Sequence, residues 1–418
     1  MSVSNPADIR PWFLQENPKK RILVLGVPLL LWEKIALLIG LLVIVILPVF
    51  YDGYDIYEFG KILMYALAVL GLNILTGFNG QFSLGHSAFF AVGAYTTAVL
   101  MDQFGMPYWT TIVPAAALCF VVGFLFGLPA LRLDGLFLAL ATFALAIATP
   151  QILKYDGLAP LTGGVQGISL NTPYPPAWVD SIAMSVSGQE MSLDRWKYIF
   201  TAIVVVIFFW LAYNLINSRT GRALIAIRDN PLSAKTMGIN LAMFKSACFG
   251  VSAMFTGVAG SLFAIMDEYL APESFTFAEA IKFLVGGVVG GIASLFGAIF
   301  GGWFVLEVPN LGDSLAANLG LFVFVVAIGL IGLIIGRQIG TFAQAMIGFV
   351  GGIVIGILLN VFMVYGFDFH VSEMIDVNNP QGLSWTVYGL LLIFAVYVMP
   401  MGATGLVQIL VRKIGKTR

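Results

Sequence analysis

Polar side chains interrupt a long apolar stretch at residues 77–86, and their types and spacing could do chemistry. Asn79, Gln81, Ser83 and His86 stand among three glycines there. Irregular polar backbone at membrane depth is tolerated only where protein buries it or where it lines a water-filled cavity. The segment therefore predicts either a broken helix whose Gln81, Ser83 and His86 line or gate a solute path, with a helix starting at Ser87, or an ordinary Gly-rich turn. In the second case His86 is a structural hydrogen-bond donor.

The polar, basic segment 219–239 is the second candidate, because it lies between two long apolar runs. An apolar stripe along it can be formed by Ala223, Leu224, Ile227 and Met237. Pro231 favours two short helices around Asp229-Asn230-Pro231, and Gly238 marks a C-terminal stop. An amphipathic helix can dock in a groove of a partner protein. The segment is interpreted as a partner-binding element, or else as a basic loop that only sets topology.

Enzymatic chemistry is not indicated elsewhere in the chain. Cys119 and Cys248 lie inside apolar runs, which predicts buried thiols without a disulfide or metal site. Gly415-Lys416-Thr417 imitates the end of a phosphate-binding loop, but Leu410 stands where the first glycine is required. No metal-ligand cluster, carboxylate pair or nucleophile and base spacing appears. The chain is therefore predicted to be no enzyme, to hold no metal and to bind no nucleic acid.

The elements that must position these residues are transmembrane helices. Hydrophobic residues make up 59% of the chain, charged residues only 10%, and the mean hydropathy is +0.95. Apolar runs long enough to cross about 30 Å of hydrocarbon occur near 35–50, 61–76, 87–103, 111–131, 133–153, 198–217, 245–266, 277–292, 296–307, 319–336, 342–365 and 384–411. We expect an all-α polytopic membrane protein with about ten to twelve helices, in which 277–307 forms two thin helices or a re-entrant pair.

Charge predicts the topology. With both termini cytoplasmic, most of the 21 basic residues fall on the inner side and most of the 22 acidic residues on the outer side, as the positive-inside rule requires. This arrangement predicts a cytoplasmic arm (1–34), a transmembrane domain (35–411) and a basic cytoplasmic tail (412–418). Within the domain we expect an outer loop at 154–197, a cytoplasmic segment at 218–244 and a helical hairpin at 308–383.

The apolar cores of the predicted spans contain no Asp, Glu, Lys or Arg, although ion-coupled carriers usually need such a group or a dedicated cation site. Energy is therefore expected from outside the chain. Five segments of the chain carry a pattern that is typical of one family: Gly77–Tyr95, Leu131–Phe143, Leu161–Ile168, 219–264 and Tyr388–Ile393. In this order they resemble the second permease subunit of branched-chain amino acid ABC importers, a family that includes urea and amide permeases. The hairpin at 308–383 departs from this pattern.

The resemblance implies alternating access driven by two cytoplasmic ATPases that bind ATP and Mg²⁺, together with a homologous second permease, a periplasmic solute-binding protein and location in a bacterial inner membrane. It implies no cofactor on this chain. The implied pathway residues are Asn79, Gln81, Ser83, His86 and Tyr95. The implied contacts with the binding protein are Thr162, Gly163, Gly164 and Gln166. The implied ATPase contacts are Arg219, Gly221, Arg222, Ile227, Arg228, Ala234, Met237 and Gly238.

Several substrates and two other classes of protein stay open. Branched-chain or other apolar amino acids come first, urea and short amides second, and aromatic acids third, because the polar motif carries no charge that would separate them. An autonomous ion-coupled carrier or channel would leave the 219–239 segment unexplained. A membrane enzyme would need a catalytic constellation that the sequence lacks.

Overall fold

A computed structural model describes residues 53–317, apart from positions 132, 134 and 188–190, together with single residues between 23 and 51 and between 389 and 405. It divides the chain into two units, Met1–Leu306 with Val398–Arg418, and residues 307–397. Apart from single positions and residues 308–317, the predicted arm, tail and hairpin (308–383) lie outside the described residues. The predicted spans at 35–50, 319–336, 342–365 and 384–411 lie there as well.

The described part of the chain is helical, as predicted. Its main helices are α2 (Tyr54–Asn73), α3 (His86–Asp102), α4 (Tyr108–Ala130), α5 (Leu136–Leu153), α8 (Leu193–Asn217), α11 (Leu241–Asp267), α12 (Phe277–Gly290) and α13 (Leu295–Ala317). A π-helical turn, η3 (Ile74–Phe78), continues α2. Shorter helices are η4 (Asp156–Leu158), α6 (Ala159–Thr162), η5 (Gly164–Gln166), α7 (Ala177–Ser187), α9 (Arg219–Asp229), α10 (Pro231–Thr236) and η6 (Pro272–Phe275).

Strands are confined to two antiparallel pairs of two-residue strands among the described residues. The strand β1 (Leu23–Val24) pairs with β2 (Val27–Pro28). The strand β3 (Ile168–Ser169) pairs with β4 (Tyr269–Leu270), with Ile168 opposite Leu270. This second pair joins the segment after α6 to the end of α11, a contact that hydropathy did not predict.

Five described helices are long and apolar enough to cross a membrane: 54–78, 108–129, 136–153, 193–217 and 241–267. Within the apolar 18-residue stretch of each helix, 83% of the first and 89% of the last is buried by protein, compared with 33% in each of the other three. Because Val113, Leu136 and Trp210 stand exposed on those three helices, their outer faces suit lipid or another membrane subunit. Thus α2 and α11 form the core, and the prediction of a polytopic helical membrane protein is confirmed.

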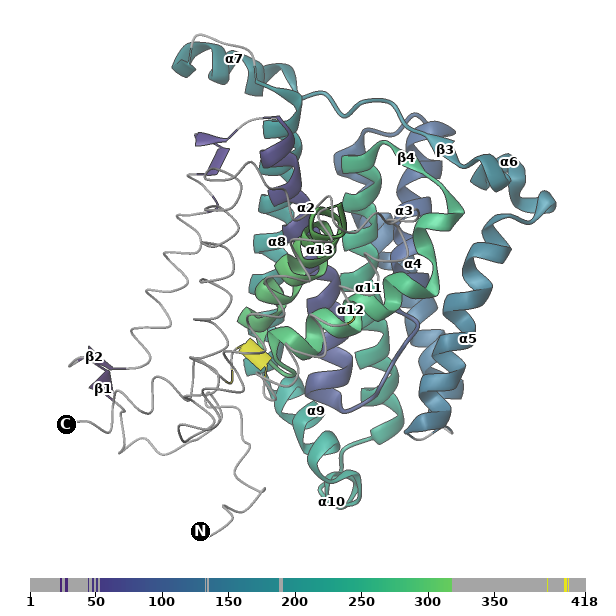
Figure 1. Ribbon diagram of the computed structural model, residues 1–418. Helices are drawn as coiled ribbons and strands as arrows, with labels where there is room; N and C mark the ends of the chain where they lie inside the picture. The colour runs from purple at the N-terminus through teal and green to yellow at the C-terminus, as the bar shows by residue number, and fades with distance from the viewer. Residues whose placement is uncertain are drawn as a thin grey trace, which may run out of the picture. The chain divides into compact units, whose positions relative to one another are not determined.

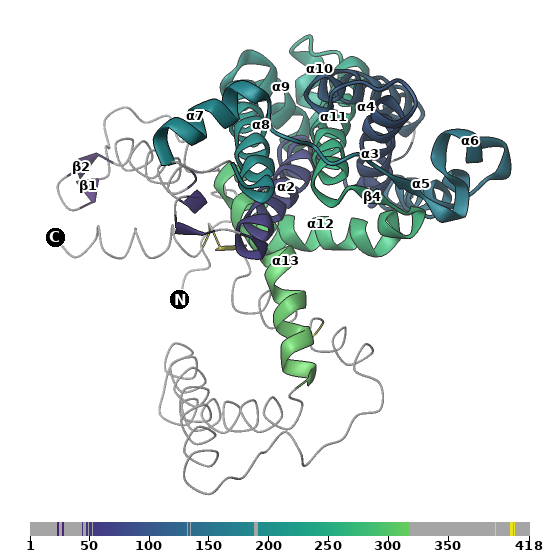
Figure 2. The ribbon, with the colours of Figure 1, turned by 90° about the horizontal axis from the view of Figure 1, so that it is seen from above.

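Small residues allow this core to pack closely. The helix α11 contacts α2, α3 and α4, and α8 packs on α2; Figure 2 shows α2 and α11 between α8 and the α3–α4 pair. A Cβ on Gly93 would overlap the carbonyl oxygen of Gly257, and one on Gly290 would overlap that of Gly297. Close backbone approach through small residues is the usual way in which membrane helices associate. The stretch 277–307 contains two helices, α12 and the first part of α13, with a break at 291–294.

The two ends of the bundle carry different short elements. The helices α9 and α10 lie at one end, and α6, α7 and the β3–β4 pair lie at the opposite end (Figure 1). The long helix α8 connects α7 to α9 and so spans the distance between these ends. A partner at one end therefore meets a different surface from a partner at the other.

Candidate functional site

The polar motif forms a break between α2 and α3. The α-helix loosens into η3 after Asn73, residues 80–85 are not helical, and α3 begins at His86, one residue before the predicted start. Gly80 adopts a φ of +74°, which favours glycine because it lacks a Cβ. Within the break, Nδ2 of Asn79 donates to Oε1 of Gln81 over 2.8 Å. The structure thus contains the irregular Gly-rich segment that both interpretations of the sequence predicted.

Hydrogen bonds fix the imidazole of His86 in one neutral tautomer. Ser252 donates its hydroxyl proton to the carbonyl of Gly71 over 2.6 Å, so its oxygen accepts from Nε2 of His86 over 2.7 Å. In the neutral imidazole the Nδ1 atom then carries no proton and accepts from the hydroxyl of Ser83 over 3.0 Å. Because the tautomer follows from these partners, His86 acts in this conformation as a neutral link between the break and α11.

The predicted pathway residues are buried in this conformation. Asn79, Gln81, Ser83, His86 and Tyr95 all lie in the interior. The Oδ1 atom of Asn79 and the hydroxyl of Tyr95 find no hydrogen-bond partner among the described residues. The structure thus gathers four of these residues in the break and places Tyr95 further along α3, where its ring packs on Phe275.

The basic segment folds as the two short helices that its sequence predicted. Ser218 caps α9 by accepting from the N–H of Gly221 over 3.2 Å. Asn230 ends α9 and caps α10 by accepting from the N–H of Ser233 over 3.0 Å, with Pro231 at the first helical position, where no N–H is needed. Gly238, at a φ of +84°, follows the end of α10. Local capping chemistry therefore determines this shape.

Burial separates the predicted ATPase contacts into two groups. Gly221, Ile227 and Ala234 are buried within the chain. Of the predicted apolar stripe, Leu224 and Ile227 face inward and Met237 is exposed, and the contacts with an ATPase stay a prediction. Arg219, Arg222 and Gly238 are exposed. Met237 is 79% exposed, and Leu232, which the sequence analysis did not select, is 73% exposed. The large apolar side chains of this segment that are exposed to solvent are therefore Leu232 and Met237.

Arg228 connects this segment to the helix break. Its Nη1 donates to the carbonyl of Gly77 over 2.8 Å, and its Nε and Nη2 donate to Asp229 over 3.0 and 2.9 Å. A Cβ on Gly80 would lie 2.8 Å from Cγ of Arg228, so the arginine stem rests on the break. Arg228 therefore contacts η3 from α9, and its predicted contact with a partner stays a prediction.

The loop at 154–197 divides its predicted contact residues in the same way. The hydroxyl of Thr162 shares its proton between the carbonyl of Leu153 at the end of α5, 2.8 Å away, and that of Leu158, 3.0 Å away. Thr162 and Gly164 are buried. Gly163 is half-buried and adopts a φ of +71°. Gln166 is exposed, as is its neighbour Val165 at 64%. The exposed tip of this motif is therefore 165–166.

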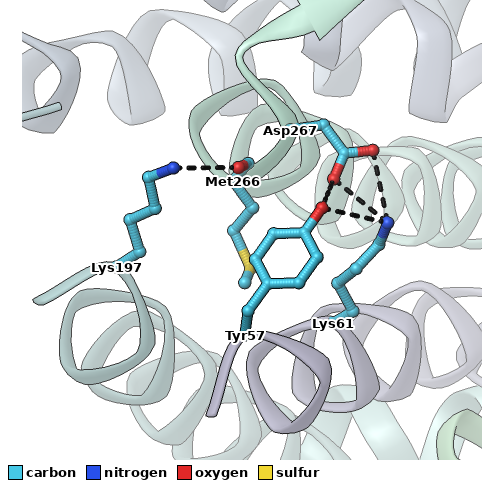
Figure 3. Close-up of polar contacts among 5 residues, drawn as sticks. All are labelled: Tyr57, Lys61, Lys197, Met266 and Asp267. Atoms are coloured by element: carbon cyan, nitrogen blue, oxygen red, sulfur yellow. Dashed lines mark hydrogen bonds and ion pairs between the residues drawn. The ribbon is translucent and has the colours of Figure 1, made fainter. Parts of the chain in front are cut away.

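Charged side chains tie helix ends together at the end of the bundle opposite α9. Lys61 lies 3.1 Å from Asp267, and Tyr57 donates to the same carboxylate. Figure 3 shows both directed at Asp267, while Lys197 reaches the carbonyl of Met266 over 3.2 Å. Lys197 also pairs with Glu268. These contacts join α2, α8 and the end of α11.

Sequence reasoning did not select Lys197, Glu268 or Asn73. Lys197 and Glu268 form an ion pair between α8 and the end of α11. In the sequence, each is marked only by its position at the end of an apolar run. Asn73 is a single amide inside an apolar run, but an amide there needs partners. Such a residue could have been selected for that reason alone.

Comparison with known proteins identifies the family. Residues 58–333 match the family described as branched-chain amino acid transport system / permease component. The high-affinity branched-chain amino acid transport system permease protein LivM of Escherichia coli K12 is 32% identical over 253 residues, 57% of this chain and 58% of that protein. The probable branched-chain amino acid transport permease protein LivM of Methanocaldococcus jannaschii is 29% identical over 263 residues, covering 54% of this chain and 72% of that protein.

The high-affinity branched-chain amino acid transport system permease protein LivH of Escherichia coli K12 is 24% identical over 250 residues, covering 57% of this chain and 78% of that protein. The match to the Escherichia coli LivM spans little more than half the length of either protein. No solved structure matches the chain. The family match covers more than half of the chain and includes the break, the basic segment and the long apolar helices. The chain is therefore a multi-pass membrane protein that belongs to the branched-chain amino acid transport permease family.

Proposed function

We propose that this chain is the transmembrane subunit of an ATP-driven importer that moves branched-chain or other apolar amino acids inward by alternating access. The observation that carries the proposal is the surface of α9–α10, where Leu232 and Met237 stand 73% and 79% exposed. Exposed Arg222 and Lys235 belong to the same segment. Large apolar side chains on a charged surface outside the long apolar helices favour a protein partner.

The partner proposed for this surface is a cytoplasmic ATPase, one of two in the assembly, which binds the ATP and Mg²⁺. The two capped helices form a short amphipathic element that can dock in a groove. The side of α9–α10 that faces the chain packs inward through Leu224, Ile225 and Ile227, so a force on the exposed side chains moves the segment as a unit.

This assignment orients the protein in a bacterial inner membrane with α9–α10 and both termini on the cytoplasmic side. The opposite end, with the exposed residues Val165 and Gln166, then faces a periplasmic solute-binding protein. A homologous second permease completes the pathway along the membrane-facing helices. The names of the relatives support branched-chain amino acids as substrates. Transport of urea or a short amide would assign the chain to an importer of those solutes instead.

The helix break supplies the proposed moving part of the pathway. Asn79, Gln81, Ser83 and His86 are buried here, and Arg228 joins their segment to α9. Movement of α9 would therefore act first on η3 and the residues that follow it. We assign the pathway role to these residues in the open state, with Tyr95 further along α3.

Co-purification tests the proposal. The tagged chain, isolated from its native membrane, is expected to retain an ATPase and a second permease. The double variant Leu232→Asp, Met237→Asp places charges on the proposed docking surface without touching a buried residue. It is expected to lose the ATPase and to keep the second permease.

The matched control is Val165→Asp, which places a charge on an exposed apolar residue at the opposite end of the bundle. This variant is expected to keep the ATPase and to lose stimulation of ATP hydrolysis by the binding protein. The docking assignment is wrong if the double variant keeps the ATPase at the wild-type level. The importer proposal itself is wrong if the wild type retains no ATPase.

A further inference from the structure

Asn73, the last residue of α2, forms hydrogen bonds through both its amide nitrogen and its amide oxygen to the backbone between α12 and α13. Its Nδ2 donates to the carbonyl of Ser294 over 2.9 Å and to that of Gly291 over 3.3 Å. Its Oδ1 accepts from the N–H of Ala293 over 2.7 Å. The residue is 3% exposed. One buried side chain therefore satisfies three backbone groups of a segment more than 200 residues away.

The segment that Asn73 holds has a strained backbone. Ala293 adopts a φ of +62° and Gly291 a φ of +116°. A non-glycine residue with positive φ persists only when the surrounding structure determines its conformation. The hydrogen bond from Ala293 to Asn73 is part of that determination. Residues 291–294 are thus a joint whose shape depends on the end of α2.

The joint at 291–294 lies directly against η3, the turn whose Gly77 accepts the hydrogen bond from Arg228. A Cβ on Gly77 would overlap both Oδ1 of Asn73 and the backbone nitrogen of Ala293. Phe78 and Ala293 also pack in one small apolar cluster with Ile216 and Ile225. Ile225 belongs to α9, so α9 reaches the joint through apolar packing as well as through the hydrogen bond from Arg228 to Gly77.

We propose that Asn73 is a positioning residue for transport, which passes the movement of α9 from η3 to the joint at 291–294 and so to α12 and α13. The physical basis is a continuous set of close contacts: Arg228 on Gly77, Gly77 on Asn73, and Asn73 on residues 291–294. Tightly packed elements shift as units because close-packed contacts do not deform continuously. This inference rests on the proposed function, since it needs an ATPase that moves α9.

The alternative is that Asn73 only stabilises the fold. Both roles require the three hydrogen bonds, so a loss of stability alone does not separate them. They differ in what happens when nucleotide binds, because only the transmitting role makes the joint respond to an event on the ATPase. The decisive readout is therefore a change at 291–294 that depends on nucleotide.

The experiment is hydrogen exchange of the backbone amides at 291–294 in the purified complex, with and without a non-hydrolysable ATP analogue. In the wild type the analogue is expected to change the exchange rate at these amides by about tenfold or more. A tenfold change corresponds to a difference of about 1.4 kcal/mol in the free energy of opening the joint between the two nucleotide states. The response is expected to disappear in Asn73→Asp, which keeps an acceptor for Ala293 but loses both donors. Uptake per ATP hydrolysed is expected to fall several-fold.

Two further variants keep the test decisive. Arg228→Met leaves Asn73 intact and is expected to reduce the nucleotide response several-fold, since the apolar packing of Ile225 remains, while the wild-type exchange rate without nucleotide is retained. Thr97→Val removes another buried interhelical hydrogen bond, between Thr97 and Ser261, and is expected to keep the response. If Asn73→Asp yields too little folded complex, the comparison of Arg228→Met with Thr97→Val tests the same transmission.

The inference is overturned if the amides at 291–294 respond to nucleotide in Asn73→Asp as they do in the wild type, or, where that variant does not fold, if Arg228→Met keeps the full response. It is also overturned if they do not respond in a wild-type complex that transports with ATP. A wild-type chain that binds no ATPase and transports without ATP would overturn the proposed function instead, and the absence of a partner in co-purification distinguishes that case.

Discussion

The guanidinium of Arg228 donates to the carbonyl of Gly77 over 2.8 Å, across 151 residues of sequence. It joins the segment proposed to meet the ATPase to the break proposed to line the pathway. The carbonyl belongs to η3, where the π-helical turn leaves the regular hydrogen-bond ladder. A donor from α9 therefore takes the place of a backbone donor from within the helix.

Replacing Arg228 by methionine should separate ATP hydrolysis from transport. The methionine keeps an apolar stem over Gly80 and loses the charge-assisted hydrogen bond, which contributes roughly 1.5–3 kcal/mol in proteins. We expect a complex that assembles and hydrolyses ATP but takes up several-fold less substrate per ATP. The measurement is the ratio of uptake to hydrolysis in proteoliposomes. An unchanged ratio would show that the contact with Gly77 has no part in coupling.

A methyl group at Gly77 should destabilise the protein. The Cβ of Gly77→Ala would overlap Asn73 and the backbone of Ala293, and overpacking of a filled interior costs about 1–3 kcal/mol. We expect a lower melting temperature in detergent. Gly287→Ala is the matched control, because a Cβ there meets nothing within 4 Å and alanine favours a helix over glycine. Equal melting temperatures for the two variants would contradict the close packing at Gly77.

Removing Lys197 should destabilise the end of the bundle opposite α9. Its side chain is 6% exposed, pairs with Glu268 and donates to the carbonyl of Met266. Loss of one partner of a fully buried ion pair costs roughly 3–5 kcal/mol. The cost here should be smaller, because Glu268 is 27% exposed and also accepts a hydrogen bond from Thr172. We expect Lys197→Met to lower the melting temperature and the double variant Lys197→Met, Glu268→Gln to recover part of the loss. The single variant Glu268→Gln is measured as well. If its loss of stability and that of Lys197→Met simply add in the double variant, the two residues are not coupled.

The pair of Lys154 and Glu273, which lie 2.6 Å apart, should give a small dependence of stability on pH. The hydrogen bond from Lys154, aided by its charge, lowers the pKa of Glu273 below its ordinary value. A carboxyl with a lowered pKa in the folded protein adds stability above its ordinary pKa and loses it as the pH falls through the lowered value. We expect Glu273→Gln to lower the melting temperature at about pH 7 and to have a smaller effect at about pH 3, below the ordinary pKa of a glutamate carboxyl. The same difference at both pH values would contradict this origin.

The parts that could be predicted from sequence are those set by local chemistry. The end of α9 at Asp229, the start of α10 at Pro231 and the break after Asn73 follow from proline, asparagine and glycine signals within a few residues. The apolar runs predicted the long helices because each must satisfy its own backbone in a membrane.

The remaining parts depend on contacts between distant residues. The direction in which Arg228 points depends on Gly77, and the role of Asn73 depends on backbone groups at 291–294. The inward burial of Ile227 and the exposure of Leu232 depend on how α9 packs against its neighbours. Helical periodicity in a short segment predicts an apolar face, but the partner of that face is set by tertiary packing.

The central claim is that ATP hydrolysed by a partner drives this permease, and reconstituted uptake tests it most directly. Proteoliposomes that hold the chain with its co-purified partners and the binding protein are supplied with labelled leucine, with or without enclosed ATP, and with or without an ionophore that collapses ion gradients. We expect uptake that requires ATP and the binding protein and that persists with the ionophore. Uptake that proceeds without ATP and stops with the ionophore would contradict the account and indicate an ion-coupled carrier.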